Sequence, residues 1–210
     1  MELSETIRRR RMVRRYDPDR AVPDEALSAC LQAAIRAPSA GFSQGWDFLV
    51  LRTPEERRTF WDNATEPADA ATPDRWLAGM QTAPVLVLCL SDPQRYLRRY
   101  AEPDKGWTDR DPSRWPVPYW DVDTGMAAML MLLTAVDHGL GGLFFGVPVT
   151  RHDAVRTALG IPPERRLVGV VSLGYAVAHP KSPSLRRGRR GLDEVAHWGR
   201  FGVTEPGAGG

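Results

Sequence analysis

An apolar run in the middle of the chain restricts its possible folds more than any other feature. The longest apolar stretch extends from Met126 to Val136, inside a helical pattern over residues 122–138. A membrane span needs roughly 20 apolar residues, so this run is too short to cross a bilayer. Because it is apolar nearly all round, it predicts a buried central helix. Glycine adopts the left-handed cap conformation at no steric cost, and the helix is predicted to end at Gly139, Gly141 and Gly142.

Shorter patterns on both sides of this helix predict an α+β domain. A first helix ends near Ile7, and a second begins after Pro23-Asp24 and runs to Ala37, where Pro38 stops it. With 210 residues, the chain is long enough for one sizeable core. We expect a single domain over residues 1–204 and a flexible tail over residues 205–210. The predicted strands are Trp46–Leu51, Val85–Leu90, Leu143–Val147 and Leu167–Val177.

Residues 92–120 differ from the rest of the chain because they combine many aromatic residues with prolines. This composition is too irregular for a helix and too aromatic for a solvated linker. It predicts either a lid over a bound substrate or a satellite hydrophobic cluster beneath a long loop. The aromatic residues that we assign to the candidate substrate lid are Trp107, Trp115, Tyr119 and Trp120.

Composition excludes several classes of protein. Hydrophobic residues make up 42% of the chain and charged residues 26%, which are ordinary values for a globular protein. Cys30 and Cys89 lie in apolar stretches without metal-ligand spacing, which predicts buried, reduced thiols. The arginine-rich first twenty residues are followed by no apolar segment, so they do not resemble a signal peptide. We therefore expect a cytoplasmic protein without a membrane partner.

The net charge of +2 conceals two basic ends. Residues 1–20 hold seven arginines against four acidic residues, and residues 181–200 hold six basic residues against two acidic ones. The planar guanidinium of arginine suits phosphate, because it donates two parallel hydrogen bonds. The clusters Arg8–Arg15 and Arg186–Arg190 therefore predict an anion site, although each cluster alone also fits a solvated basic face. Nucleic acid, acidic lipid and a small phosphorylated ligand all remain open.

No standard catalytic motif accompanies these clusters. The four histidines show no spacing typical of a metal site and no nearby nucleophile elbow. The chain contains no GxxxxGK[ST] sequence and no GxGxxG between a strand and a helix. The sequence thus predicts no metal site and disfavours a Rossmann or P-loop enzyme.

Four segments form a pattern when they are taken together. They read RRMVRRYD over 10–17, APSAGFSQGWDF over 37–48, GLGG over 139–142 and RGRRGLDEV over 187–195. In order and spacing they resemble the nitroreductase family of flavoproteins over residues 4 to about 200. The first two segments are similar to that family's RRSxRxF/Y and APSxxNxQPW patterns. The resemblance implies a nitroreductase-like α+β fold, with a central mixed sheet flanked by helices, and a homodimer with one FMN in each of two interface clefts.

The resemblance also implies which residues bind the cofactor. By this resemblance, Arg10 contacts the phosphate and Arg14 lies near the pyrimidine edge of the flavin. Arg187 and Arg189 resemble the basic pair that closes the phosphate site. Residues 38–44 correspond to a segment that reaches the flavin from the other subunit, and residues 145–147 to the loop whose backbone amide faces the flavin N5. The implied cofactor-binding residues are Arg10, Arg11, Met12, Arg14, Pro38, Ser39, Phe42, Gln44, Phe145, Gly146, Val147, Arg187 and Arg189.

Three residues depart from the family pattern. Met12 stands where the family has a serine, Phe42 where it has an asparagine, and Gly45 where it has a proline. Met12 and Phe42 cannot reproduce the side-chain hydrogen bonds of the polar residues that they replace. Phe42 instead offers an aromatic face that can stack on the cofactor or on a flat substrate.

The implied activity is an NAD(P)H-dependent oxidoreductase with ping-pong kinetics. NAD(P)H gives hydride to the flavin N5, and a planar electron-poor acceptor such as a nitroaromatic or a quinone takes it up at the same face. The flavin supplies the chemistry, so no side chain is assigned as a catalytic acid or base. The sequence does not distinguish NADH from NADPH.

Three other interpretations remain. A specialised flavoenzyme of the same fold, such as a reductive dehalogenase or a biosynthetic dehydrogenase or reductase, would share the cofactor residues. A flavin-binding protein that stores or destroys the cofactor would bind FMN with little turnover. A nucleotide- or nucleic-acid-binding module would use the two basic clusters alone, but the low net charge disfavours it, and we expect no nucleic-acid partner.

Overall fold

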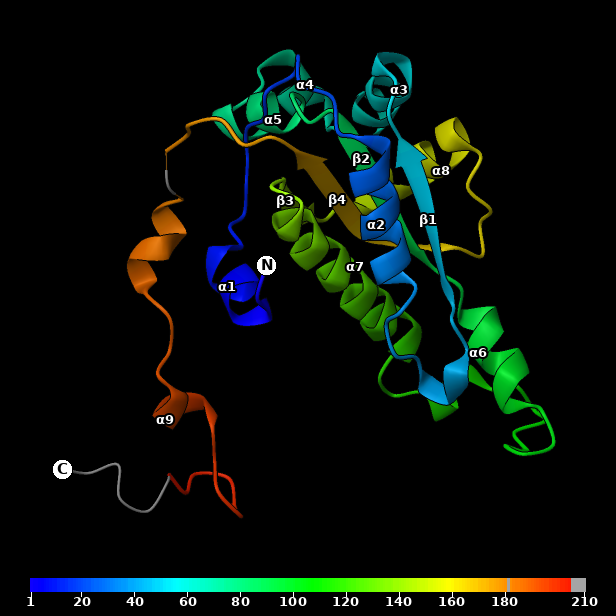
Figure 1. Ribbon diagram of the computed structural model, residues 1–210. Coiled ribbons are helices and arrows are strands. Elements are labelled where there is room, and N and C mark those ends of the chain that lie inside the picture. Colours follow the sequence, from blue (N-terminus) through cyan, green and yellow to red (C-terminus); the bar gives the residue numbers. More distant parts are fainter. Residues whose placement is uncertain (181, 205–210) are drawn as a thin grey trace. The chain divides into compact units, whose positions relative to one another are not determined.

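The centre of the fold is a four-stranded sheet in the order β1-β2-β4-β3 (Figure 1). The computed structural model describes residues 1–180 and 182–204, so the predicted tail at 205–210 lies outside the described residues. All three strand pairs are antiparallel, whereas a mixed sheet was expected. Within the described residues, the one parallel pairing is an isolated bridge between Met12 and Gly142. The strands are β1 (Trp46–Leu51), β2 (Val85–Ser91), β3 (Gly141–Phe145) and β4 (Arg166–Gly174).

Strand β2 is buried along its whole length because helices cover both faces of the sheet. Side chains alternate between the two faces of a strand. Accordingly, Val85, Val87 and Cys89 join one hydrophobic cluster, and Leu86, Leu88 and Leu90 join the other. The prediction that apolar runs mark the strands is confirmed, with β1 matching its predicted bounds and β3 beginning two residues earlier than expected.

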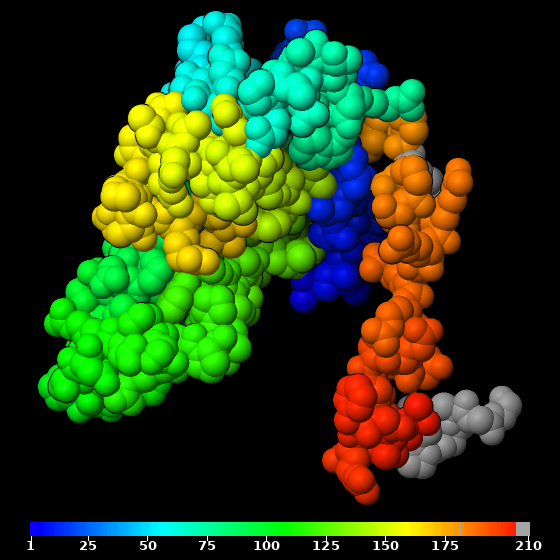
Figure 2. Space-filling view, turned by 180° about the vertical axis from the view of Figure 1, so that it is seen from behind, coloured from blue at the N-terminus to red at the C-terminus, as the bar shows by residue number. Residues whose placement is uncertain are grey.

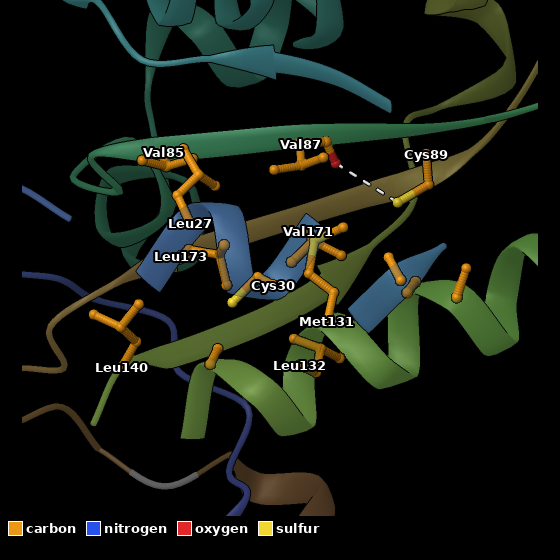
Figure 3. Close-up of a cluster of buried hydrophobic side chains, with 14 of the residues drawn as sticks. Leu27, Cys30, Val85, Val87, Cys89, Met131, Leu132, Leu140, Val171 and Leu173 are labelled. Carbon is orange, nitrogen blue, oxygen red and sulfur yellow. Dashed lines mark hydrogen bonds between the residues drawn. The ribbon is translucent and has the colours of Figure 1, made fainter. Parts of the chain in front are cut away.

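The first cluster lies between the sheet and two helices, α2 (Asp24–Ala34) and α7 (Tyr119–Asp137). Figure 3 shows side chains from both helices, among them Leu27, Cys30 and Met131, gathered against the valines of β2 and β4. The N-terminal helix α1 (Leu3–Arg9) also packs against α7. Helix α2 ends three residues before the predicted limit, and residues 35–37 form a turn that leads to Pro38.

Helix α7 is buried on one face only in the single chain, whereas a buried central helix was expected. Its residues Ala127, Met131 and Ala135 are each 0% exposed. Its other face leaves large apolar side chains open to solvent, namely Tyr119, Val122, Met126 and Met129. The helix ends as predicted, since Gly139 takes a left-handed conformation with φ of 73° directly after the last turn. None of the helices in residues 1–180 and 182–204 combines the length and apolar character that a membrane crossing requires.

The second cluster lies between the opposite face of the sheet and a group of shorter helices. Thr53 and Glu56 form a capping box at the start of α3, which explains why a helix begins there. Residues 54–80 and 150–165 lie side by side over this face (Figure 2, cyan to green-blue and yellow). The helices are α3 (Pro54–Ala64), α4 (Pro67–Ala71), α5 (Arg75–Met80) and α8 (His152–Leu159), with a 3₁₀ turn at Val149–Arg151.

The aromatic segment 92–120 contains a helix that its composition did not predict. Asp92 caps α6 (Pro93–Tyr100) by accepting hydrogen bonds from the backbone N–H groups of Gln94 and Arg95. An Asp followed by Pro at the first helical position is a standard helix start. The expectation of an irregular segment is therefore wrong for residues 93–100. Shorter 3₁₀ turns occur at Ala40–Phe42 and Pro112–Arg114.

The chain divides into two units, Met1–Ala178 and His179–Gly210. The first contains the sheet and both hydrophobic clusters. The described part of the second contains a 3₁₀ turn at Pro183–Arg187 and the short helix α9 (Leu192–Val195), in which Arg190 pairs with Glu194 at 3.1 Å. A single domain over residues 1–204 stays a prediction.

Both thiols lie in the core, and this burial generates a test of the fold. Burial raises the pKa of Cys30 to about 12 and that of Cys89 to about 12. A thiol with a raised pKa stays protonated at pH 8, and only the thiolate reacts with disulfide reagents. We expect neither cysteine to react with such a reagent in the native protein, and both to react in concentrated urea. Rapid labelling of either residue before unfolding would contradict the packing.

Candidate functional site

The loop Arg10–Arg14 is fixed to the edge strand of the sheet. Met12 forms the parallel bridge with Gly142, and the backbone N–H of Val13 donates to the Gly142 carbonyl at 3.1 Å. Val13 is buried, while Arg10 and Arg14 on either side of it are half-buried. The backbone of the loop is thus held by β3 and leaves its arginines at the surface.

Tyr16 holds the end of this loop from inside the core. Its side chain is 1% exposed, and its hydroxyl donates to the Val13 carbonyl at 2.9 Å. The same hydroxyl lies 2.7 Å from the Ser172 hydroxyl on β4. Burial raises the pKa of Tyr16 well above its usual range, so this phenol remains a hydrogen-bond donor in alkaline solution as well as at neutral pH. Tyr16 therefore connects the loop Arg10–Arg14 to the core.

The arginines of the loop differ from their neighbours on α1 in their charge partners. Arg8 and Arg9 both pair with Glu5. Within the described residues, no carboxylate pairs with Arg10, Arg11 or Arg14. Their guanidinium contacts are to Met12 and to backbone carbonyls, for example Arg14 Nη1 to the Met12 carbonyl at 3.3 Å. Three cations without a counter-charge on one loop create a positive potential that attracts anions.

A second group of predicted residues lies at the other end of β3. Phe145 stacks on Trp61 with ring centroids 5.7 Å apart and an interplanar angle of 5°. Gly146 is exposed, and the backbone N–H groups of Gly146 and Val147 donate to no acceptor in the part of the chain that the structure describes. These two amides are free to bind a hydrogen-bond acceptor on a ligand.

A hollow of about 150 Å³ opens beside this loop. The aromatic rings of Trp61, Trp76 and Phe145 form part of its wall, and Glu66, Asp69 and Asp74 add carboxylates. A cavity of roughly this volume accommodates a benzene-sized ring. Trp61 and Trp76 were not predicted as site residues, because they lie far from the recognised motifs in sequence and only the fold brings them to Phe145.

The first two groups of predicted residues lie at the two ends of β3. Met12, Phe145 and Val147 all pack, partly buried, against the same hydrophobic cluster. The loop 10–14 and the loop 145–147 therefore lie on the same side of the sheet. This arrangement agrees with a shared ligand.

The third predicted group, residues 38–44, lies near the start of α7, whereas the arginine loop lies beyond the end of that helix. The backbone N–H of Ala40 donates to Asp123 near the start of α7 at 2.9 Å, and the hydroxyl of Tyr96 donates to the same carboxylate at 2.7 Å. Gly142, which holds Met12, follows the last turn of α7. The 15 residues from Asp123 to Asp137 extend about 21 Å along a helix. One chain does not bring this segment to the arginine loop.

The structure shows the surroundings of two residues that depart from the family pattern, Gly45 and Phe42. A side chain at Gly45 would place its Cβ 2.3 Å from the Tyr96 ring, so Tyr96 occupies the space that a proline would need. Phe42 is 75% exposed and has a positive φ of 56°. Ser39 and Gln44 hold each other, because the Gln44 backbone N–H donates to the Ser39 hydroxyl at 3.0 Å. Pro38 is exposed.

The four candidate lid residues belong to one aromatic cluster. The Trp115 ring lies within 6 Å of the rings of Trp107, Tyr119 and Trp120, and it also contacts Tyr96 and Tyr100. Trp120 is buried, whereas Tyr119 is 44% exposed. These rings pack against one another, as expected for a satellite hydrophobic cluster, which is the alternative to a lid. The role of the four residues as a substrate lid stays a prediction.

The remaining predicted residues, Arg187 and Arg189, belong to the second unit, where both are exposed. Their role in phosphate binding stays a prediction. As for metals, no group of three or more potential ligands occurs among residues 1–180 and 182–204.

Comparisons with known proteins connect these features to a family. The model of the nitroreductase family matches residues 7–175. "Putative NADH dehydrogenase/NAD(P)H nitroreductase" of Archaeoglobus fulgidus is 33% identical over 168 residues, which cover 79% of this chain and 80% of that protein. The NADH dehydrogenase of Thermus thermophilus is 28% identical and covers 90% of this chain and 92% of that protein.

Solved structures show the same fold at lower identity. A crystal structure described as a "putative nitroreductase in complex with FMN" from Exiguobacterium sibiricum has a TM-score of 0.73 and 21% identity. The similarity covers 94% of this chain and 97% of that one. A nitroreductase family protein from Clostridium difficile has a TM-score of 0.68 and 23% identity, with 96% and 100% covered.

The role of Tyr16 predicts a measurable loss of stability. Replacing Tyr16 by Phe leaves the buried Val13 carbonyl without its side-chain donor, and such a loss costs about 1–3 kcal/mol. We expect urea denaturation to show a fall of this size in the free energy of unfolding. Tyr175→Phe is the matched control, because the Tyr175 ring contacts the Arg20 guanidinium and its hydroxyl has no partner within the described residues. Its effect should stay within about 0.5 kcal/mol, and equal losses in both variants would contradict the role of Tyr16.

Proposed function

Because the chain belongs to the nitroreductase family, we propose that it is an FMN-dependent oxidoreductase that transfers hydride from NAD(P)H to a planar, electron-poor acceptor. The acceptor class includes nitroaromatics and quinones. The observation that supports this best is the set of unpaired arginines Arg10, Arg11 and Arg14 on a loop fixed to β3. An FMN phosphate carries nearly two negative charges, which such a loop can neutralise.

The cofactor residues divide into two kinds of contact. We assign Arg10 and Arg11 to the phosphate and Arg14 to the pyrimidine edge of the ring, with Met12 acting through its backbone. A cation near that edge stabilises negative charge on the ring and raises its reduction potential. Arg187 and Arg189 are assigned to the phosphate on the family pattern alone.

The free backbone amides of Gly146 and Val147 fit the ring nitrogen that exchanges hydride. When bound, the flavin supplies the redox chemistry by accepting hydride from the donor and giving it to the acceptor. The amides orient the ring, and Phe145, stacked on Trp61, fixes the loop that presents them. No side chain in this arrangement is required to move a proton.

The hollow beside residues 145–148 is the proposed site for the acceptor. Its aromatic walls, Trp61, Trp76 and Phe145, favour planar ligands because aromatic rings pack well against flat π systems. Its size selects a single ring over a larger group. The aromatic cluster of Trp107, Trp115, Tyr119 and Trp120 remains the candidate lid over an acceptor.

The site requires a second copy of the chain. Residues 38–44, with Pro38, Ser39, Phe42 and Gln44, are held at the start of α7, far along the helix from the arginine loop. The exposed apolar face of α7 offers the surface on which two copies meet. In such a homodimer, segment 38–44 of one subunit reaches the cofactor of the other.

Cofactor binding provides the first test. The purified protein should bind one FMN per chain, and its absorption bands should bleach when NADPH or NADH is added without oxygen. Arg10→Ala should weaken FMN binding at least about tenfold, because a hydrogen bond to a charged group contributes roughly 1.5–3 kcal/mol. Fluorescence titration of FMN measures the affinity.

Arg9→Ala is the control for this variant, since Arg9 lies one residue away and pairs with Glu5 at 3.5 Å. It should bind FMN as the parent protein does. A parent protein that cannot take up FMN would contradict the proposed function, and equal losses in the two variants would contradict the assignment of Arg10.

The subunit arrangement provides a second test. Met129→Glu places a charge on the exposed apolar face of α7, where Met129 is 47% exposed. Burying an unpaired charge at an interface costs several kcal/mol, so we expect monomers in sedimentation and a loss of bound FMN. Val149→Glu is the control, because Val149 is 82% exposed and lies outside this helix. A Met129→Glu protein that stays dimeric would contradict the interface.

A further inference from the structure

Phe42 holds an unusual conformation at the surface. A bulky residue with a positive φ is rare, because its Cβ crowds the backbone, and Phe42 has φ of 56° while remaining 75% exposed. Hydrogen bonds on both sides of Phe42 hold this conformation. The Ser43 hydroxyl donates to the Ala40 carbonyl, and the Arg99 side chain donates to the Gly41 carbonyl. Strain of this kind clusters at ligand sites. Here it presents an aromatic face to solvent.

This ring borders an open hollow of about 320 Å³ whose other walls are mostly arginine. Ligand sites begin at roughly this volume. The hollow lies between the turn at residues 40–43, helix α6 and Arg165, and it is separate from the hollow beside Phe145. Its lining residues are Phe42, Ser43, Asp92, Arg95, Arg98, Arg99, Glu102 and Arg165.

The four arginines differ in how fully their charges are compensated. Arg99 donates two hydrogen bonds to Asp104 and one to Glu102. Arg165 pairs with Asp47 at 2.7 Å, with the buried Asp92 at 3.1 Å and with Glu164 at 3.8 Å. Both are fixed parts of the wall.

Arg95 and Arg98 are different, because Asp92 is their only charge partner within the described residues. They lie 3.7 Å and 3.5 Å from it, beyond normal hydrogen-bond distance. Asp92 already accepts two backbone hydrogen bonds and pairs with Arg165, so it does not depend on them. Two half-exposed guanidinium groups therefore have free donors beside an exposed aromatic ring.

We propose that this hollow binds the adenosine 2′-phosphate end of NADPH, with the adenine stacked on Phe42 and the 2′-phosphate held by Arg95 and Arg98. A purine offers the flat face that an exposed ring stacks on, and a phosphate offers the oxygens that two guanidinium forks bind. NADH lacks this phosphate, so the enzyme prefers NADPH as its electron donor. The inference rests on the proposed function, because segment 38–44 connects the hollow to the cofactor.

Nucleotide binding tests the hollow without any turnover. Isothermal titration of the dimeric holoprotein should show that adenosine 2′,5′-bisphosphate binds at least about tenfold more tightly than adenosine 5′-monophosphate. Arg95→Gln and Arg98→Gln should each reduce this difference severalfold. Phe42→Leu should weaken both nucleotides by a similar factor, since the adenine is common to them.

Arg58→Gln is the matched control, because Arg58 is exposed on α3 and lies outside the hollow. It removes the same charge and should bind both nucleotides as the parent protein does. Thermal unfolding and FMN content check that each variant is folded. In anaerobic flavin reduction, Arg95→Gln and Arg98→Gln should raise the KM for NADPH about tenfold and that for NADH less than threefold.

The outcomes separate the inference from the proposed function. Equal affinity for the two nucleotides, or a bisphosphate affinity that is the same in Arg98→Gln and Arg58→Gln, would overturn the inference while flavin reduction could still occur. A holoprotein whose flavin neither donor reduces would contradict the proposed function. In that case the titrations alone would decide whether the hollow binds the nucleotide.

Discussion

Strand β2 runs through the middle of the core and is buried on both of its faces. All seven of its residues are buried, and their alternation divides the core into two hydrophobic clusters. Each face of the sheet must then be covered by its own helices, α2 and α7 on one side and α3, α5 and α8 on the other. Strand β3, at one edge, is left to pair with the arginine loop through Met12. The loop that carries the candidate cofactor arginines is therefore held at the edge of the sheet.

Helix α7 connects the core to the proposed assembly. One face of it fills the first cluster, while the opposite face exposes large apolar side chains such as Met126 and Met129. An apolar helix surface of this kind is costly to leave in water. The same helix separates residues 38–44 from the arginine loop along its length. The proposed homodimer explains both features, because in it a second chain covers this face and supplies segment 38–44 to the cofactor.

Charge pairing distinguishes arginines that neighbour each other in the sequence. Arg8 and Arg9 are compensated by Glu5, whereas Arg10, Arg11 and Arg14 have no carboxylate partner in the described chain. On α6, Arg99 is fully paired, whereas Arg95 and Arg98 share the buried Asp92 at long distance. Uncompensated guanidinium groups are costly unless an anion or water satisfies them. Arg10, Arg11 and Arg14 belong to one segment that the family pattern assigns to the flavin. Arg95 and Arg98 lie beside another such segment, residues 38–44. The two groups of arginines agree with the proposal of two phosphates on two different ligands.

The amino-acid sequence alone predicted the four strands, the first two helices, the end of α7 and the family. Apolar runs located all four strands, glycine ended α7, and the arginine and APS motifs carried the family resemblance, because each depends on residues close together in the chain. It did not show that α7 is covered on one face only, that α6 begins at Asp92, or that Trp61 and Trp76 meet Phe145. Nor did it distinguish paired from unpaired arginines. These features were decided by the tertiary structure, since burial and charge compensation depend on which distant residues the sheet brings into contact.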